Sequence, residues 1–492
     1  MKIKIAILFA LFLSCTVTYS QTDDFTDTYK KRVLETTEVD FLTSYYTQDG
    51  DNASVTGGIG TEKLTDFTPT IVVSYPLNDD DVLTIDVGIS AYTSASSSNL
   101  DPFDSSGASS GGDDDDDDDD DDRSFARASD VEGSPWVASS GASAGDVWGS
   151  VSASYSHSSD DRNSIWTAHT SFATEYDYSS IGIGGSFTKL FNEKNTEISI
   201  SAQAYIDAWK PRYPTELDSY VEAGYNLTNG FFEDIDILNQ DGNIIDNTGN
   251  SGPIWSPVDG FELIKDKGRN SYSVSLSFSQ ILSKNAQISL FVDFVQQEGW
   301  LANPMQRVYF GDRDNYYIGN AESIPNYTSS TNKDVFQLAD DFERLPDTRF
   351  KTPFGMRFNY YINEFVTVRT YYRYYFDNWG INSHTASIEV PIKISKKFTL
   401  YPSYRYYTQT AADYFAPYEQ NLSTQEYYTS DYDLSAFNAS QYGFGVSYTD
   451  IFTKLKVWKF GLKSIDLRFN QYERNTGLNA SIVSAGFKFI MQ

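Results

Sequence analysis

Ten consecutive aspartates at positions 113–122 are the residues of this sequence whose type and spacing point most directly to chemistry. Ca²⁺ binds several carboxylate oxygens in flexible geometry, so the run is a candidate for divalent-cation capture. It has no shaping turn and no fixed ligand spacing, and like charges repel one another, which favours a disordered, solvated segment. We therefore expect no tightly bound cofactor and at most loosely bound Ca²⁺. The candidate ligands are Asp113, Asp114, Asp115, Asp116, Asp117, Asp118, Asp119, Asp120, Asp121 and Asp122.

A second group of charged residues lies in segments where polar and apolar side chains alternate. These residues occupy the polar positions, so they would all lie on one face. If these segments are strands around an aqueous lumen, rings of charge on the inner face would set ion selectivity. The alternative is a structural network in which Arg and carboxylate side chains pair and fill the interior, and the sequence leaves both interpretations open. The candidates are Arg357, Arg369, Arg373, Arg405, Glu38, Asp40, Asp86, Asp293, Glu389 and Asp466.

The sequence offers little for catalysis or for a compact metal site. Its 3 His and 1 Cys exclude most histidine-zinc sites, any disulfide framework and any thiolate cluster. His157, His169 and His384 fit no Ser-His-Asp arrangement that spacing can establish, because triads are recognised by geometry. We therefore expect that the protein is not an enzyme.

The elements that would position these residues are short segments with a period of two. In 272–279 (YSVSLSFS), for example, aromatic and branched residues alternate with serines. This is the pattern of a strand with one apolar and one polar face. About sixteen such segments occur, with a range of 14–18. They lie near 37–46, 68–77, 81–94, 145–157, 164–176, 180–190, 196–208, 270–282, 286–297, 350–362, 365–377, 384–394, 398–409, 439–449, 463–472 and 480–491.

The connections between these segments differ in length at the two ends. Links after even-numbered segments are mostly tight and polar, whereas several links after odd-numbered segments are long, notably 97–144, 209–269 and 298–349. Short periplasmic turns, long extracellular loops and an even strand count are typical of an all-β fold with a single transmembrane antiparallel β-barrel. A polar inner face would account for the mean hydropathy of −0.43. A soluble β-sandwich or propeller is the alternative.

The N-terminus has the features of an export signal. A basic tip, a short apolar stretch and small residues predict a secretory signal peptide at 1–20. The rival interpretation is a lipoprotein acylated at Cys15. We expect a short periplasmic segment at 21–36, then the barrel at 37–492 in the outer membrane of a Gram-negative cell, with both termini periplasmic. The loop at 97–144 is expected to be acidic and disordered.

Composition narrows the range of partners. The 492 residues include 37 Lys and Arg against 68 Asp and Glu, a formal net charge of −31, so the chain lacks the excess cation that nucleic-acid binding requires. Aromatic residues make up 16% of the chain, which argues against general disorder. They suit the lipid-facing bands of a barrel. We therefore expect outer-membrane lipid as the main contact and no nucleic acid.

Several stretches carry a resemblance to a known family. The segments 38–46 (EVDFLTSYY), 48–51 (QDGD) and 57–62 (GGIGTE) come first, and 140–143 (SGAS) and 207–211 (DAWKP) follow. Together they resemble an uncharacterised Gram-negative outer-membrane β-barrel family, domain-of-unknown-function family 3570. The resemblance covers most of the mature chain and implies an outer-membrane barrel. It implies no activity, because the family has none assigned.

The expected role is a passive pore or transport component. The alternative is a non-conducting surface scaffold or a partner of an exported protein or lipoprotein, with weak divalent-cation binding by the aspartate run. Aromatic residues in the long loops, including Trp255 and Trp300, would contact a sugar, a partner protein or one another. Packing against one another is the favoured interpretation.

Overall fold

The computed structural model describes residues 32–94, 134–136, 146–175, 177–233, 235–264, 268–332, 334–450 and 453–492. The chain divides into two units, Met1–Arg32 and Val33–Gln492, and the second contains every described strand. The predicted signal peptide, most of the predicted segment at 21–36 and all ten consecutive aspartates lie outside the described residues. The same holds for the predicted loop at 97–144, apart from 134–136.

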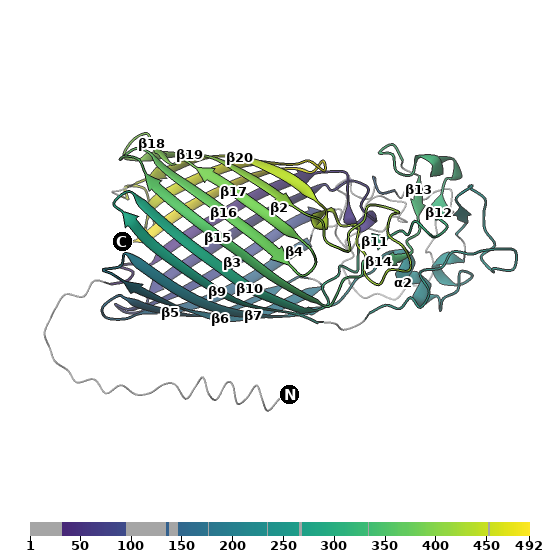
Figure 1. The fold of residues 1–492 in the computed structure, drawn as a ribbon, viewed down its shortest axis with the longest axis horizontal. Helices are drawn as coiled ribbons and strands as arrows, with labels where there is room; N and C mark the ends of the chain where they lie inside the picture. Colours follow the sequence, from purple (N-terminus) through teal and green to yellow (C-terminus); the bar gives the residue numbers. More distant parts are fainter. Residues whose placement is uncertain are drawn as a thin grey trace, which may run out of the picture. The chain divides into compact units, whose positions relative to one another are not determined.

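The strands of the second unit form one closed antiparallel barrel (Figure 1). β1 (Glu38–Asp49) pairs with β2 (Leu64–Pro76) on one side and with β23 (Asn479–Met491) on the other, so the sheet closes on itself. Of its eighteen strands, β18 (Ile392–Lys393) and β21 (Lys456–Val457) are two-residue segments, so sixteen strands build the wall, as predicted. The others are β3 (Asp81–Ser94), β4 (Asp146–Ser158), β5 (Ser164–Thr174), β6 (Tyr178–Phe191), β7 (Thr196–Trp209), β9 (Gly268–Ser283), β10 (Ala286–Gly299), β15 (Thr348–Tyr361), β16 (Thr367–Asp377), β17 (Asn382–Glu389), β19 (Phe398–Gln409), β20 (Phe437–Thr449) and β22 (Phe460–Arg474).

Several strand boundaries differ from the prediction, and two of these differences have local reasons. β22 begins at Phe460 rather than near 463, because the register shifts between Leu462 and Ser464. Such a bulge reverses the side-chain parity, so a period-two pattern detects only part of the strand. The predicted strand at 384–394 is interrupted between β17 and β18, where Pro391 lacks the backbone N–H that a ladder needs.

The connections differ in length at the two ends of the barrel, as predicted. Tight turns join β2 to β3, β6 to β7 and β9 to β10, whereas long connections join β7 to β9 and β10 to β15. We call these the turn end and the loop end. The first residue of β1 and the last residues of β23 both lie at the turn end, where Met491 N–H donates to Thr37 O (2.8 Å).

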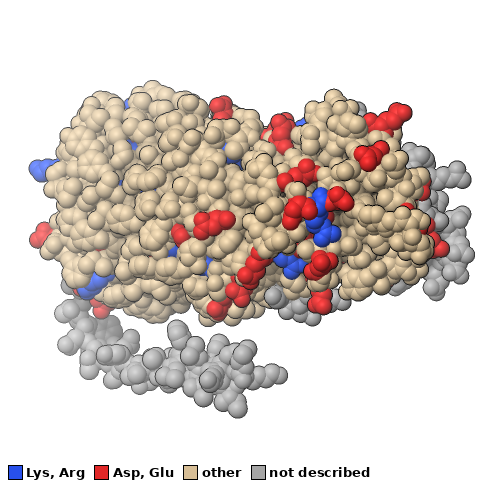
Figure 2. All heavy atoms as spheres, turned by 45° about the vertical axis from the view of Figure 1, so that its right-hand side comes forward, with Lys and Arg blue, Asp and Glu red and all other residues tan. Residues whose placement is uncertain are grey.

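The outward face of the barrel is apolar. Large exposed side chains on two adjacent strands illustrate it: Ile181, Ile183, Phe187, Ile198 and Ile200. The face drawn in Figure 2 carries few charged side chains over the barrel wall and more of them, mainly acidic, toward the loop end. Closure pairs the strand backbone groups with neighbouring strands, which a bilayer requires of any spanning structure.

The long connections fold into a region of their own, which we call the cap. It comprises the described residues of 50–63, 210–264, 300–347 and 410–436. Its elements are η1 (Ser54–Thr56), α2 (Thr215–Glu222), η3 (Gly230–Phe232), β8 (Ile237–Asn239), β11 (Arg307–Val308), β12 (Tyr316–Gly319), η4 (Ala321–Asn326), β13 (Val335–Gln337), β14 (Asp341–Phe342) and η5 (Tyr432–Leu434). Among the described residues, no helix combines the length and the apolar sequence needed to cross a membrane.

A hydrophobic core holds the cap together. Leu217, Phe232 and Trp255 from one long connection pack with Phe336 and Phe342 from the next. All five side chains are essentially inaccessible to solvent. Burying large aromatic side chains stabilises a fold by about 1.5–3 kcal/mol each. The expectation that loop aromatics pack against one another is therefore confirmed for this cluster.

Candidate functional site

The strand register defines the inner face of the barrel. Directly opposite residues in an antiparallel pair point to the same side of the sheet. Arg357 lies opposite Tyr371. Tyr371 lies opposite Ser387, which lies opposite Arg405. This side is the inner one, because the alternate positions carry the exposed apolar side chains. The structure places all ten predicted charged residues on it: Arg357, Arg369, Arg373, Arg405, Glu38, Asp40, Asp86, Asp293, Glu389 and Asp466.

One acidic residue bridges two arginines across the inner face. Glu389 Oε1 lies 2.9 Å from Arg369 Nη1, and Oε2 lies 2.8 Å from Arg468 Nη1. The Arg468 guanidinium also lies 4.9 Å from the ring centroid of Tyr401. The two arginine side chains are 49% and 42% exposed, so solvent screens these pairs and they add little to stability. These ion pairs matter because they hold charged groups at fixed positions beside the lumen.

A second paired group lies near the turn end. Lys488 Nζ lies 2.6 Å from Glu38 Oε2 and 3.5 Å from Asp40 Oδ2, and Lys463 Nζ lies 3.1 Å from Glu38 Oε1. Three basic partners were not among the residues predicted from the sequence: Lys463, Lys488 and Arg468. Lys488 alternates with apolar residues in the last strand, so its parity was a usable signal. Lys463 sits at the bulge, where parity fails.

Six of the ten predicted lumen charges have no ion-pair partner among the described residues. These are Arg357, Arg373, Arg405, Asp86, Asp293 and Asp466. The Nε atom of Arg373 is buried and makes no hydrogen bond with the described residues. The inner face therefore carries both paired and unpaired charges. The paired ones fit a structural network, whereas the unpaired ones would act on ions in an aqueous lumen.

Arg357 is held by aromatic rings. Its guanidinium lies 5.5 Å from the ring centroid of Phe291 and 5.7 Å from that of Tyr371, and these two rings are stacked with centroids 5.9 Å apart. Gly355 makes the arrangement possible, because a Cβ there would lie only 2.1 Å from the Phe291 ring. A cation over an aromatic face is stabilised by the ring quadrupole. Arg357 is thus oriented without a carboxylate.

The part of the wall formed by β7 and β9 is lined mainly by serines. Serines 271, 273, 275 and 277 of β9 face inward, opposite Tyr205, Gln203, Ser201 and Ser199 of β7. Small side chains occupy little of the interior, and a sixteen-strand barrel is wide enough for an aqueous channel. The inner face is therefore uneven, with charge concentrated on β15–β17, β19, β22, β23 and β1.

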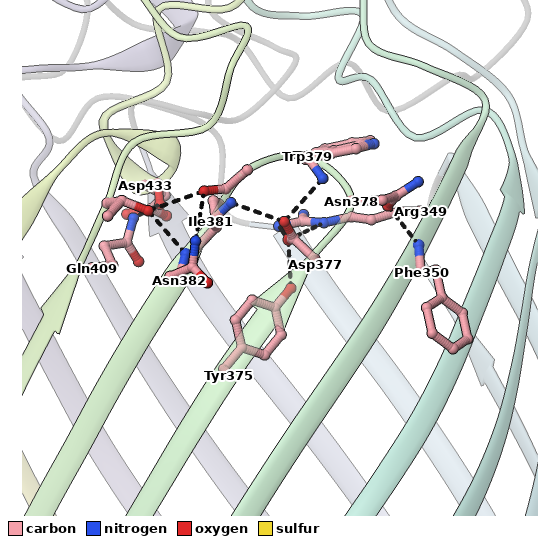
Figure 3. A network of polar contacts seen from close by, with 12 residues as sticks. Arg349, Phe350, Tyr375, Asp377, Asn378, Trp379, Ile381, Asn382, Gln409 and Asp433 are labelled. Carbon is pink, nitrogen blue, oxygen red and sulfur yellow. Dashed lines mark hydrogen bonds and ion pairs between the residues drawn. The ribbon is translucent and has the colours of Figure 1, made fainter.

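Asp377, at the end of β16, organises the short connection to β17 (Figure 3). Its buried carboxylate accepts hydrogen bonds from Arg349 Nε (2.9 Å) and the Tyr375 hydroxyl (2.6 Å). The other oxygen accepts from the backbone N–H groups of Trp379 and Ile381, both at 3.0 Å. The Arg349 guanidinium lies 4.2 Å from the Trp379 ring centroid. One carboxylate thus fixes the loop end of three strands.

We expect Asp377→Asn to destabilise the barrel by about 2–3 kcal/mol, because Arg349 would lose its buried charge partner. Urea unfolding in lipid vesicles measures the change. Asp259→Asn removes the same charge from an exposed position of the cap and serves as the matched control. Equal unfolding midpoints for the two variants would contradict a structural role for Asp377.

A buried ion pair joins three connections of the cap. Arg307 Nε and Nη2 donate to the two carboxylate oxygens of Glu216 at 2.7 and 3.0 Å, and Nη1 donates to Val55 O (3.0 Å). The side chains are 6% and 0% exposed. Burial lowers the pKa of Arg307 and the facing carboxylate raises it, with a net shift upward. Neither residue belongs to the charged residues predicted from the sequence.

Glu343, Asp340 and Asp431 are acids of the cap with raised pKa values. Burial, with the like charge of Asp431 added, raises the pKa of Glu343 to about 8. Burial raises the pKa of Asp340 to about 7, although Arg313 lies 3.1 Å away and opposes the shift. Burial and then Asp433 raise the pKa of Asp431 to about 6. At neutral pH the cap therefore holds protons that the same groups would release in an unfolded chain.

We expect the cap to lose stability as the pH rises from about 4 to about 8. The unfolded chain ionises these acids near their ordinary values of 3.8 and 4.5, whereas the folded cap retains the protons until the pH passes about 6 to 8. Urea unfolding followed by tryptophan fluorescence at several pH values tests this. Glu343→Gln should flatten the dependence. Stability that rises over this interval would refute the prediction.

The histidines lie in separate environments. His169 Nδ1 is 2.9 Å from Ser154 Oγ on the inner face, and His384 Nδ1 is 2.7 Å from the Tyr372 hydroxyl on the outer face. His157 Nδ1 lies 2.6 Å from Asp81 Oδ1 near the turn end. In the part of the chain that the structure describes, no group of three or more His, Cys, Asp or Glu side chains is arranged to hold a metal ion.

Comparison with known proteins gave one family and several solved structures. The sequence model of a family described as "Protein of unknown function (DUF3570)" matches residues 9–486. A search of curated proteins found no match. The chain is similar to a bacterial polysaccharide outer membrane secretin, with 8% identity, a TM-score of 0.41 and coverage of 93% of this chain and 99% of that one. It is also similar to the Pseudomonas putida toluene transporter TodX (9% identity, TM-score 0.36, 93% and 90% covered) and to Pseudomonas aeruginosa OccK2 in complex with glucuronate (7%, 0.36, 94% and 99%).

Proposed function

The chain belongs to the family described as "Protein of unknown function (DUF3570)", and on that premise we propose that it is a passive outer-membrane pore or a component of a transport route. The observation that carries the proposal is the inner face, which is polar and bears charges of both signs inside a closed sheet with an apolar exterior. Such a lumen suits a water-filled path across a bilayer. The role requires no catalytic step.

The proposed location is the outer membrane of a Gram-negative cell. The apolar outer face would contact lipid, and the tight turns with both chain termini would lie in the periplasm. The cap would then lie on the cell exterior. The closed sheet, the length difference between turns and loops, and the export signal expected at 1–20 support this orientation.

Single-channel recording tests the proposal. We expect the purified, refolded barrel to produce discrete conductance steps in planar bilayers, together with the heat-modifiable gel migration of a folded barrel. Heat-denatured protein is the control and should be silent. Persistently closed traces from protein that migrates as folded would overturn the pore and favour the alternative below.

The alternative is a non-conducting surface scaffold that binds an exported protein or a lipoprotein. The folded cap favours it, because its own core and the buried pair of Arg307 and Glu216 make it a rigid outer surface. The aspartates at 113–122 would add weak divalent-cation binding. Calcium titrated into the full-length barrel should give weak heat that disappears when all ten aspartates are replaced by Ser. No heat at millimolar calcium would end that part of the proposal.

A further inference from the structure

A cavity of about 470 Å³ lies between the inner face of the barrel and the cap. Its barrel side is formed by the loop ends of β1, β20, β22 and β23, with Tyr46, Gln441 and Tyr472 among the lining residues. Its cap side includes Asn303 and Gln306. The volume falls in the range of about 300–1,000 Å³ that small-molecule sites occupy.

Gln306 is the most constrained polar residue of this cavity. It is 7% exposed, and its Nε2 donates to Ser54 Oγ (3.1 Å) and to Asp431 Oδ2 (3.2 Å). Its Oε1 is buried and has no hydrogen-bond partner among the described residues. An unpaired buried acceptor is costly. A ligand hydroxyl entering beside it would supply the missing donor.

Two other amides of the cavity have unused hydrogen-bonding capacity. The side chain of Gln441 makes no hydrogen bond with another described residue. Asn303 uses only its oxygen, which accepts from Met305 N–H (3.1 Å), so its Nδ2 donors are unpaired within the described structure. Each neutral amide presents donors and acceptors at once. Together with the tyrosine rings, they suit a ligand that carries several hydroxyl groups on an otherwise apolar frame.

The charged lining residues restrict the ligand further. Glu62 accepts from Asn52 N–H (3.0 Å), Asp431 accepts from Gln306 and from Asp433 N–H (2.9 Å), and the Asp433 side chain pairs with Arg474 (2.8 Å). The carboxylates are therefore partly engaged already. Three acids against one arginine repel anions. The amides of Gln306, Gln441 and Asn303 remain as the neutral hydrogen-bonding groups for a ligand.

From this lining we propose that the cavity binds a neutral saccharide of one or two rings. The amides of Gln306, Gln441 and Asn303 would pair with its hydroxyl groups, and Tyr46 or Tyr472 would pack against a ring face. The site lies where the lumen meets the cap, so a bound sugar would occupy the entrance of the barrel. The inference does not require that the barrel conducts, because binding is an equilibrium property of the folded protein.

Saturation-transfer NMR on the full-length barrel in detergent tests the site, with D-glucose and maltose as probes. We expect transfer to both sugars with millimolar affinity, weakened about tenfold by Gln306→Leu and by Gln441→Leu. Gln240→Leu changes an exposed amide of the cap and should leave binding unchanged. Heat-modifiable migration verifies that each variant is folded. If Gln306→Leu fails to fold, Gln306→Asn, which keeps the amide group, is measured in its place.

Three results would overturn the inference. The first is no transfer to either sugar at tens of millimolar. The second is equal binding by the wild type and both Leu variants, which would place the sugar elsewhere. The third is binding of putrescine in place of sugar, which would make the cavity a cation site. A silent barrel in bilayer recordings would refute the pore without affecting this result.

Discussion

Glu216→Ala is expected to unfold the cap while the barrel stays intact. The substitution leaves the Arg307 guanidinium buried beside Phe336 without its carboxylate partner. Breaking a buried pair in this way costs about 3–5 kcal/mol. That is a large fraction of the stability of any small folded region. Limited trypsin digestion should then cut within 210–347, whereas heat-modifiable migration should remain that of a folded barrel.

Two further variants distinguish the effect of leaving a buried charge unpaired from the effect of losing a side chain. Glu222→Ala changes an exposed acid of the same helix and should leave the digestion pattern unchanged. Glu216→Leu combined with Arg307→Met removes both charges and should restore much of the resistance, because apolar replacement of a buried pair is often neutral or stabilising. A Glu216→Ala cap as resistant as the wild type would show that the pair does not hold the three connections together.

Glu389→Gln is expected to shift ion selectivity toward anions, provided that the barrel conducts as proposed. The substitution removes the carboxylate that lies between Arg369 and Arg468, so two guanidinium groups would face the lumen unpaired. A unit charge at ~6 Å in water contributes about 0.7 kcal/mol, which corresponds to about a threefold change in the permeability ratio. The reversal potential in a KCl gradient measures this ratio.

The opposite substitution should have the opposite sign. Arg369→Ser with Arg373→Ser removes two inner-face cations and should shift selectivity toward K⁺. Glu364→Gln changes the same charge as Glu389→Gln at an exposed turn and serves as the control. If none of the inner-face variants moves the reversal potential beyond this control, the charges form a structural network and do not select ions.

Local alternation was sufficient to predict most of the wall. The serine row of β9 and the parity of Arg357, Arg369 and Arg373 follow from the pleat alone, because successive side chains point to opposite faces. The same alternation in the last strand places Lys488 on the inner face, so this residue could also have been predicted. Lys463 could not, since a single inserted residue reverses the pattern. Strand ends near such irregularities were therefore harder to predict than the regular parts of the strands.

By itself, the sequence determined a barrel of about sixteen strands, with tight turns at one end and long connections at the other. Within each strand, apolar residues alternate with polar ones, because one face meets an apolar surrounding and the other a polar one. A strand can therefore be detected without knowledge of distant contacts. Only the tertiary structure decided which charges pair. Glu216 and Arg307 are 91 residues apart, and Glu389 and Arg468 are 79 apart. Their meeting depends on barrel closure and on the packing of aperiodic loops into the cap, which no local pattern encodes.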